Sequence, residues 1–211
     1  MLDELLQDSL AVANQPKQQR SQETIQKILQ AACQCVAELG YGQASTIKIA
    51  KTAGVSQGAL FKHFPNKIAL MVAMTTYYES RARMEAVANM PADILDVSIK
   101  KRICYFVDGA WTFCQSLEYR AIDEVYAQSR TDQEMAKGLK SLVLSDAQAG
   151  DLALLIPELA NNESVQWLSQ LAYAMIDRLG DVSGALKKKT IIFRLEYIKQ
   201  MLEREVTLLV K

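Results

Sequence analysis

A short stretch of the sequence, GVSQGALFKHFPNK, carries side chains that suit the reading of a nucleic acid. On a helix that turns about 100° per residue, Leu60 and Phe64 fall on one face, and Gly58 and Lys62 fall on the opposite face. Gln57 stands at the amino end, which is the part of a recognition helix that first enters the major groove. A glutamine can make two hydrogen bonds to adenine, and a lysine can reach a guanine or a phosphate. The side of this helix that carries Gly58 therefore suits docking on DNA.

Gly58 is the most informative residue of this face, because a glycine inside a helix costs about 1 kcal/mol relative to alanine. A bare backbone there, with Ala59 beside it, indicates that something must come close. His63 and Lys67 can bind phosphates, together with the free N–H groups at the starts of the second and fourth helices. Packing against another protein would also explain small exposed residues, and a lone histidine is often structural. The combination of features favours DNA.

A longer helix must brace this short one. It is expected to begin near Ser21, a suitable N-cap, and to end at Gly40. Its apolar residues repeat at the spacing of three and four that makes one buried face: Ile25, Ile28, Leu29, Ala32, Val36 and Leu39. The pattern predicts a helix that faces a core.

Two short helices follow this longer helix. Ser45 or Thr46 can cap the first of them. Gly54 supplies a tight turn, and Ser56 caps the next helix, which is expected to run to about Phe64. Two short helices joined by a glycine-containing turn and braced by a longer one form a helix-turn-helix.

Helical periodicity dominates the rest of the chain as well, and hairpin signals such as Asn-Gly are absent. The further expected helices cover 66–90, 92–117, 119–130, 132–147, 162–180 and 187–210. Near the amino end, residues 2–12 place leucines on one stripe before Pro16 interrupts. That segment can be a short accessory helix or a frayed tail, and the sequence does not decide between them. The expected fold is all-α.

Charge is distributed unevenly along a chain whose formal net charge is zero. Residues 17–70 hold seven lysines and arginines against two glutamates, a net of +5. The same count gives −3 for residues 1–16 and −2 for 71–211. A basic segment inside a mildly acidic protein is a footprint for a polyanionic partner.

Composition excludes several other classes of function. The four cysteines lack metal-ligand spacing, and the single histidine lies on the candidate DNA face, so no metal, cofactor or catalytic set is expected. Buried thiols are the simplest role for the cysteines, with redox sensing as the alternative. The N-terminus is acidic, and no apolar run approaches the roughly 20 residues that span a bilayer. We expect a cytoplasmic protein that is not an enzyme.

The run STIKIAKTAGVSQGALFKHFPNKIAL resembles the DNA-binding signature of TetR-family transcriptional regulators, preceded by their usual first helix, which ends here in LGYG. The resemblance covers residues 21 to about 72. It implies an N-terminal extension over 1–19, a three-helix helix-turn-helix DNA-binding domain over 20–74, and a larger helical effector-binding and dimerisation domain over 75–211. It also implies a homodimer on a near-palindromic operator.

By position, the family's DNA-contacting sites fall on Ser45, Thr46, Ile47, Gln57, Gly58, Phe61, Lys62, His63 and Lys67. Two of these residues depart from the family pattern. Phe61 stands where tyrosine is common and lacks the hydroxyl that would bond a phosphate. Ile47 stands where a polar or basic residue is common, so it either touches a thymine methyl group or is simply exposed.

The family's effector pocket should combine apolar walls with a few polar groups. The segment YFVDGAWTFC offers aromatic residues around a single acid, Asp108, which a cationic effector or Arg102 could neutralise if it is buried; otherwise it points to water. The effector-binding candidates are Tyr105, Asp108, Trp111, Trp167 and Tyr173. Aromatic residues at helical spacing are also typical of a core.

The last two helices carry broad apolar faces and are the expected dimer contact, although stability of the bundle would explain them too. The interpretation that follows is a one-component transcriptional regulator, a repressor by family expectation, that an unknown small-molecule effector releases from DNA. The alternative is a helical protein-interaction module that has lost DNA binding, for which Phe61 and Ile47 are mild support.

Overall fold

The computed structural model describes residues 2–143 and 150–210, and within these ranges the chain is helical with no strand. The expected all-α class is confirmed. Contacts divide the chain into two compact units. The N-terminal unit comprises Met1–Tyr77 and Ala121–Gly138, and the C-terminal unit comprises Tyr78–Arg120 and Leu139–Lys211.

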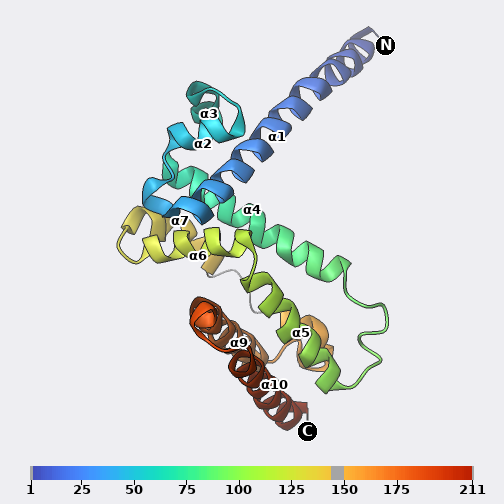
Figure 1. Ribbon diagram of the computed structural model, residues 1–211. Helices are drawn as coiled ribbons and strands as arrows, with labels where there is room; N and C mark the ends of the chain where they lie inside the picture. Colours follow the sequence, from blue (N-terminus) through green and yellow to red (C-terminus); the bar gives the residue numbers. More distant parts are fainter. Residues whose placement is uncertain (1, 144–149, 211) are drawn as a thin grey trace. The chain divides into compact units, whose positions relative to one another are not determined.

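In the N-terminal unit, α2 (Thr46–Ala53) packs against α1 (Leu2–Gln43), and α3 (Gln57–His63) packs against α2 (Figure 1). The predicted apolar face of α1 is buried at Ile28, Leu29, Ala32 and Val36, but Leu39 is exposed. Gly40 has a φ of 75° and a ψ of 159°, which breaks the helix where the sequence predicted its end. A positive φ of this kind favours glycine over any residue with a Cβ.

The start of α1 differs from the prediction. The helix does not begin at Ser21 and does not stop before Pro16 but runs from Leu2 without interruption. Proline removes one backbone donor, and the glutamine- and lysine-rich residues that follow it are good helix formers. Of the two possibilities for residues 2–12, the backbone adopts the helix, as part of α1 and not as a separate element.

Helices α4 (Lys67–Ala88) and α6 (Leu117–Ser129) each have residues in both units, and α7 (Gln133–Val143) begins in the N-terminal unit. The predicted domain boundary near residue 75 lies close to the division of α4 at Tyr77. The N-terminal unit also takes in Ala121–Gly138, a segment that the sequence assigned to the effector domain. Residues 144–147 of the expected helix 132–147 lie outside the described residues.

The C-terminal unit packs α5 (Ile99–Cys114), α8 (Gly150–Leu155), α9 (Glu163–Val182) and α10 (Lys188–Val210) around one apolar core. Two short 3-10 helices, η1 (Pro157–Leu159) and η2 (Ser183–Ala185), connect these elements. The sequence did not predict α8, and it started α5 too early. Residues 92–96 form turns and residue 97 a bend, and the Arg102 guanidinium donates to the carbonyl oxygens of Leu95 (2.7 Å) and Val97 (3.0 Å) in this segment.

Candidate nucleic-acid interface

The turn between α2 and α3 is held by local hydrogen bonds at both helix ends. The Ser45 hydroxyl accepts the N–H of Lys48 at 3.3 Å and caps α2, and the Ser56 hydroxyl accepts the N–H of Ala59 at 3.1 Å and caps α3. Between them, Gly54 adopts the left-handed conformation, with φ 67° and ψ 31°. This turn is the one predicted, and of the two cap candidates for α2 the structure uses Ser45.

The inward side of α3 consists of Leu60 and Phe64, both buried, as the periodicity predicted. The opposite side carries Gly58 and Lys62, and Gln57 stands at the amino end of the helix; all three are exposed. A Cβ added at Gly58 would meet only the Ser56 hydroxyl oxygen, at 3.9 Å. Among the described residues, no neighbour requires a glycine there, and the open space suits the close approach of a partner to the backbone.

The start of α2 adjoins the start of α3. Gln57 Nε2 donates to the Thr46 hydroxyl at 3.4 Å, which orients the glutamine amide from its neighbour. Ile47 is 65% exposed, and Phe61 is also exposed, so both remain available to a partner. Ser45, Thr46 and Ile47 thus lie at the start of α2, Gln57 and Gly58 at the start of α3, and Phe61 and Lys62 about one turn further along α3.

Two predicted phosphate ligands are less free than the sequence suggested. Lys67, the first residue of α4, donates to the carbonyl oxygen of Tyr41 and lies over its ring, with Nζ 3.8 Å from the ring centroid. Burial lowers the pKa of the Lys67 ammonium group. His63 is half-buried, with its ring 6.5 Å from that of Phe64. Lys67 therefore has a structural partner that its position in the motif did not reveal.

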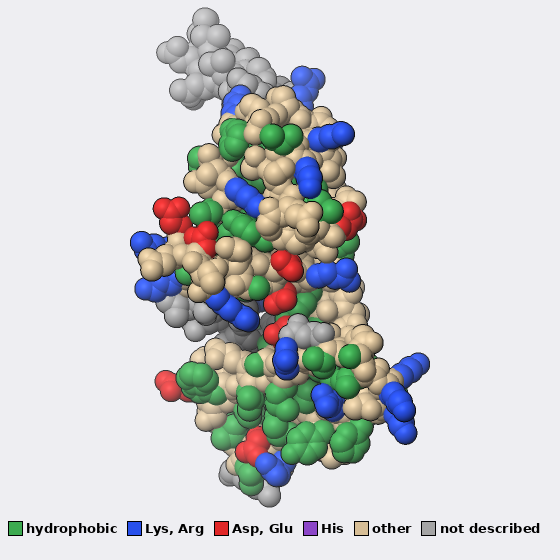
Figure 2. All heavy atoms as spheres, turned by 60° about the vertical axis from the view of Figure 1, so that its left-hand side comes forward, with side chains coloured by type: hydrophobic (Ala, Val, Ile, Leu, Met, Phe, Trp, Pro, Cys, Tyr) green, Lys and Arg blue, Asp and Glu red, His purple; other side chains and the backbone are tan. Residues whose placement is uncertain are grey.

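The α2–α3 face carries exposed lysines. Lys48, Lys51 and Lys62 are exposed on these two helices, and neither helix contains an acidic residue. Figure 2 shows lysine and arginine side chains scattered over the surface of the N-terminal helices. A face of this kind attracts the phosphates of a duplex through its charge and leaves the polar ends of α2 and α3 to contact bases.

The effector candidates in the C-terminal unit differ in their surroundings. Asp108 is not buried: its side chain is 58% exposed and pairs with Lys199 Nζ of α10 at 2.8 Å. Trp167 is also exposed. Tyr105 donates to the carbonyl oxygen of Ala86 at 3.3 Å, and Tyr173 packs edge-on against Phe106 at 5.2 Å. Trp111 is half-buried at the edge of the core.

Arg102 is not the partner of Asp108 either. Its buried guanidinium bonds the Leu155 carbonyl oxygen at 3.2 Å and the Glu158 carboxylate at 3.3 Å, besides the two carbonyls that precede α5. No nearby sequence signal connects Arg102 to a residue 56 positions later. The charge-pairing hypothesis for Asp108 is therefore replaced by an ion pair with Lys199.

Two hollows on the described part of the chain lie apart from these candidates. Two shallow hollows are lined by Pro157–Glu163 and by residues of α10 near its end, and neither includes any of the five effector candidates. Among the residues that the structure describes, no three histidine, cysteine or acidic side chains gather as metal ligands. None of the described helices is both long and apolar enough to cross a membrane. The four cysteines form no disulfide, and Cys33 and Cys35 are buried.

Sequence comparisons show that the chain is similar to known regulators. The family profile described as "Bacterial regulatory proteins, tetR family" matches residues 28–74. An uncharacterized HTH-type transcriptional regulator of Mycobacterium tuberculosis, Rv2912c, is 32% identical over 146 residues, which are 67% of this chain and 71% of that protein. The HTH-type transcriptional repressor AcnR of Corynebacterium diphtheriae is 42% identical over 62 residues, 29% of this chain and 32% of that protein.

Solved structures share the fold. A TetR-family regulator from Rhodococcus sp. aligns with a TM-score of 0.68 at 20% identity, over 85% of this chain and 98% of that one. A transcriptional regulator from Saccharomonospora viridis, solved in complex with choline, aligns with a TM-score of 0.65 at 17% identity, over 86% of this chain and 96% of that one.

Proposed function

Because the chain belongs to the TetR family of bacterial transcriptional regulators, we propose that it is a repressor that binds a near-palindromic operator through the outward face of α2 and α3. Members of this family are transcriptional regulators and not enzymes. The observation that carries the proposal is Gly58, which is exposed and has no packing reason within the unit, opposite a buried anchor of Leu60 and Phe64. The name of the AcnR relative supports the repressor role.

In this proposal, the position of each side chain on the interface determines which part of the DNA it contacts. Gln57 and Lys62 lie in the major groove and contact base edges, while Ser45, Thr46 and His63 contact phosphates. Ile47 and Phe61 make apolar contacts, for which thymine methyl groups are suitable partners. Lys67 supports the interface through Tyr41 and can offer its remaining N–H groups to a phosphate.

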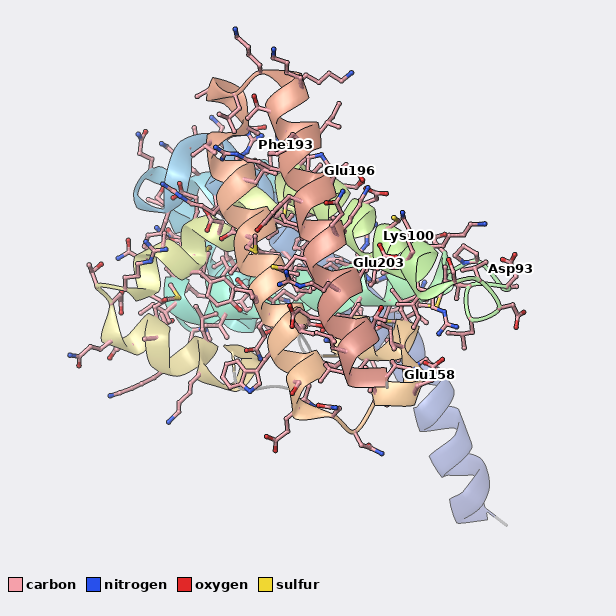
Figure 3. The ribbon with its side chains drawn as sticks, turned by 90° about the horizontal axis from the view of Figure 1, so that it is seen from below. Asp93, Lys100, Glu158, Phe193, Glu196 and Glu203 are labelled. Atoms are coloured by element: carbon pink, nitrogen blue, oxygen red, sulfur yellow. The ribbon has the colours of Figure 1, made fainter. Side chains whose placement is uncertain are left out.

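The dimer is proposed to form through α9 and α10, which pack side by side (Figure 3). Trp167 and Leu171 form an exposed row on α9, and Phe193 and Tyr197 form another on α10. Figure 2 shows broad hydrophobic surface on the C-terminal unit. An exposed apolar face of this kind marks a protein–protein contact, and a second copy of the same face would bury it symmetrically.

The effector is proposed to be a small molecule that enters the core of the C-terminal unit. Ser169 supports a site there, because its hydroxyl is fully buried on α9 and has no hydrogen-bond partner among the described residues. A ligand with an apolar body and one polar group would satisfy that hydroxyl. To release DNA, it must bind the released state more tightly than the DNA-bound state.

The test is selection of duplexes from a random-sequence pool by the full-length protein, followed by affinity measurements with Lys62→Ala. If Lys62 reads a base, the substitution costs about 1 to 3 kcal/mol and relaxes preference at one position of each half-site. A phosphate contact would instead weaken all sequences alike. Lys188→Ala removes an equally exposed lysine at the start of α10 and serves as the control.

The alternative, an interaction module without DNA binding, has the exposed Ile47 and Phe61 in its favour. The same selection separates the two functions. A regulator enriches duplexes that share a sequence, whereas an interaction module enriches none. Unchanged binding by Lys62→Ala would remove Lys62 from the proposed interface without removing the regulator.

A further inference from the structure

Tyr41 is held at both ends of its backbone by residues from two other helices. It directly follows the break in α1 at Gly40. Its N–H donates to Glu124 Oε2 of α6 at 3.2 Å, and its carbonyl oxygen accepts a hydrogen bond from Lys67 of α4. The Tyr41 ring lies beneath the same lysine ammonium. All four residues belong to the N-terminal unit.

The surroundings of Tyr41 strengthen these contacts. Burial raises the pKa of the Tyr41 hydroxyl, and the Asp132 carboxylate just before α7 adds to the rise. Burial also lowers the pKa of Lys67. Both directions mean that the site is partly removed from water, where a hydrogen bond is stronger than in solvent.

A short segment, residues 41–46, connects Tyr41 to the DNA-binding face, and hydrogen bonds and burial hold it in place. The Ala44 N–H bonds the Gly40 carbonyl oxygen at 3.2 Å, and Ala44 is fully buried. The next residue, Ser45, caps α2. Thr46 follows and accepts the hydrogen bond from Gln57. A shift of Tyr41 therefore moves the start of α2 and, with it, the residue that orients Gln57.

We propose that Glu124 is a positioning residue for DNA binding, which acts by fixing the Tyr41 N–H and so the start of α2. The inference rests on the proposed function, since it concerns the same DNA-binding face. Glu124 lies on α6, outside the matched residues 28–74, so the family signature does not identify it. It touches no DNA in this role, and its carboxylate is needed as an acceptor and not as a charge.

The choice of substitutions separates the hydrogen bond from the charge. Glu124→Ala removes the acceptor, whereas Glu124→Gln keeps a side-chain oxygen in reach of the Tyr41 N–H and loses only the charge. Glu118→Ala removes a carboxylate from the same helix, six residues earlier, and serves as the matched control. Circular dichroism at the assay temperature checks that each variant is folded.

Two measurements are made on the full chain. Hydrogen exchange followed by mass spectrometry reports on the peptide that contains the Tyr41 amide. Affinity is measured for the duplex that the unmodified protein selects from a random-sequence pool. We expect Glu124→Ala to exchange faster in this peptide and to bind the duplex up to about tenfold more weakly, the effect of losing one hydrogen bond. Glu124→Gln should recover most of both losses, and Glu118→Ala should match the unmodified protein.

Three results would overturn the inference. Faster exchange in Glu124→Ala with unchanged DNA affinity would make the contact structural only. Equal weakening in Glu124→Gln and Glu124→Ala would assign the effect to charge and not to the hydrogen bond. If the unmodified protein selects no duplex, the proposed function fails and this role of Glu124 fails with it, and the exchange data would still show whether Glu124 holds Tyr41.

Discussion

Gln57 and Thr46, eleven residues apart in the sequence, are joined by a hydrogen bond of 3.4 Å from the glutamine amide to the threonine hydroxyl. The bond links the first residue of α3 to the first residue of α2. It fixes the orientation of an amide that would otherwise rotate freely at the tip of the recognition helix. In the proposed interface, this pre-orientation lowers the entropy lost when Gln57 contacts a base.

Thr46→Val tests this relationship, because valine keeps the branched shape and removes the acceptor. We expect weaker discrimination between the selected operator and a duplex altered at the base that Gln57 contacts, with a loss of about 1 kcal/mol. A competition experiment with the two duplexes measures the ratio of their affinities. Thr112→Val, a change of the same kind on α5, is the control and should leave the ratio unchanged.

Gly58→Ala should change stability and DNA affinity in opposite directions. The added methyl group has open space in the free protein and raises helix propensity, so the free energy of unfolding should rise by up to about 1 kcal/mol. On DNA, the methyl group fills the gap through which the backbone approaches, and affinity should fall. Chemical denaturation and operator binding measure the two effects. A variant that is more stable and binds equally well would show that nothing approaches Gly58.

Much of this interface could be predicted because its signals are local. Ser45, Gly54 and Ser56 act through hydrogen bonds and backbone conformations within a few residues, and Leu60 and Phe64 follow from periodicity alone. The contacts that could not be predicted join distant parts of the chain. Glu124 is 83 residues from Tyr41, and a sequence carries no periodic signal for such a pair.

In the C-terminal unit, even less of the candidate site could be predicted from the sequence. For Asp108 the sequence left open a buried acid or one that points to water, and the helix turns it outward to Lys199, whereas Arg102 is buried. Periodicity identifies which residues share a face, but the direction of that face depends on the packing of α5 against α9 and α10.

Gly138→Ala should destabilise the N-terminal unit. A Cβ at Gly138 would lie 2.7 Å from Val72 Cγ2, a branched side chain with little freedom to move aside. We expect a loss of about 1 to 3 kcal/mol in the free energy of unfolding, as for other overpacked sites. Gly109→Ala is the matched control: it also lies within a helix, but a Cβ there meets nothing within 4 Å. The control should be neutral or stabilising, and equal losses in both variants would contradict the steric explanation.

Phe193→Glu tests the proposed dimer. Phe193 is 70% exposed in the single chain, and burying a glutamate against a second copy without a partner is costly. We expect the dimer dissociation constant to rise by about thirtyfold or more, in line with loss of an aromatic hot spot. Sedimentation equilibrium measures the constant. Met84→Glu introduces the same charge at a residue that is 71% exposed on α4, and it should leave the dimer intact.

Glu158→Gln should remove part of the stability of the C-terminal unit in a pH-dependent way. A hydrogen bond from its own backbone lowers the pKa of Glu158 below its ordinary value of 4.5. Burial opposes this shift, and the hydrogen bond and charge of Arg102 lower the pKa further. A carboxyl group whose pKa falls on folding stabilises the folded state above its unfolded pKa, and this contribution is lost as the pH falls through the folded pKa. Because Glu158 stays 47% exposed, the contribution is about 1 kcal/mol or less.

Urea denaturation of the unmodified protein and of Glu158→Gln at a series of pH values measures this difference. The unmodified protein should be the more stable of the two at pH 7, and the gap between them should shrink steadily once the pH drops below about 4.5. Glu163→Gln changes an exposed glutamate at the start of α9. Its free energy of unfolding should not differ from that of the unmodified protein in this pH-dependent way. A gap for Glu158→Gln that stayed constant down to pH 3 would mean that Arg102 gains nothing from the charge of its partner.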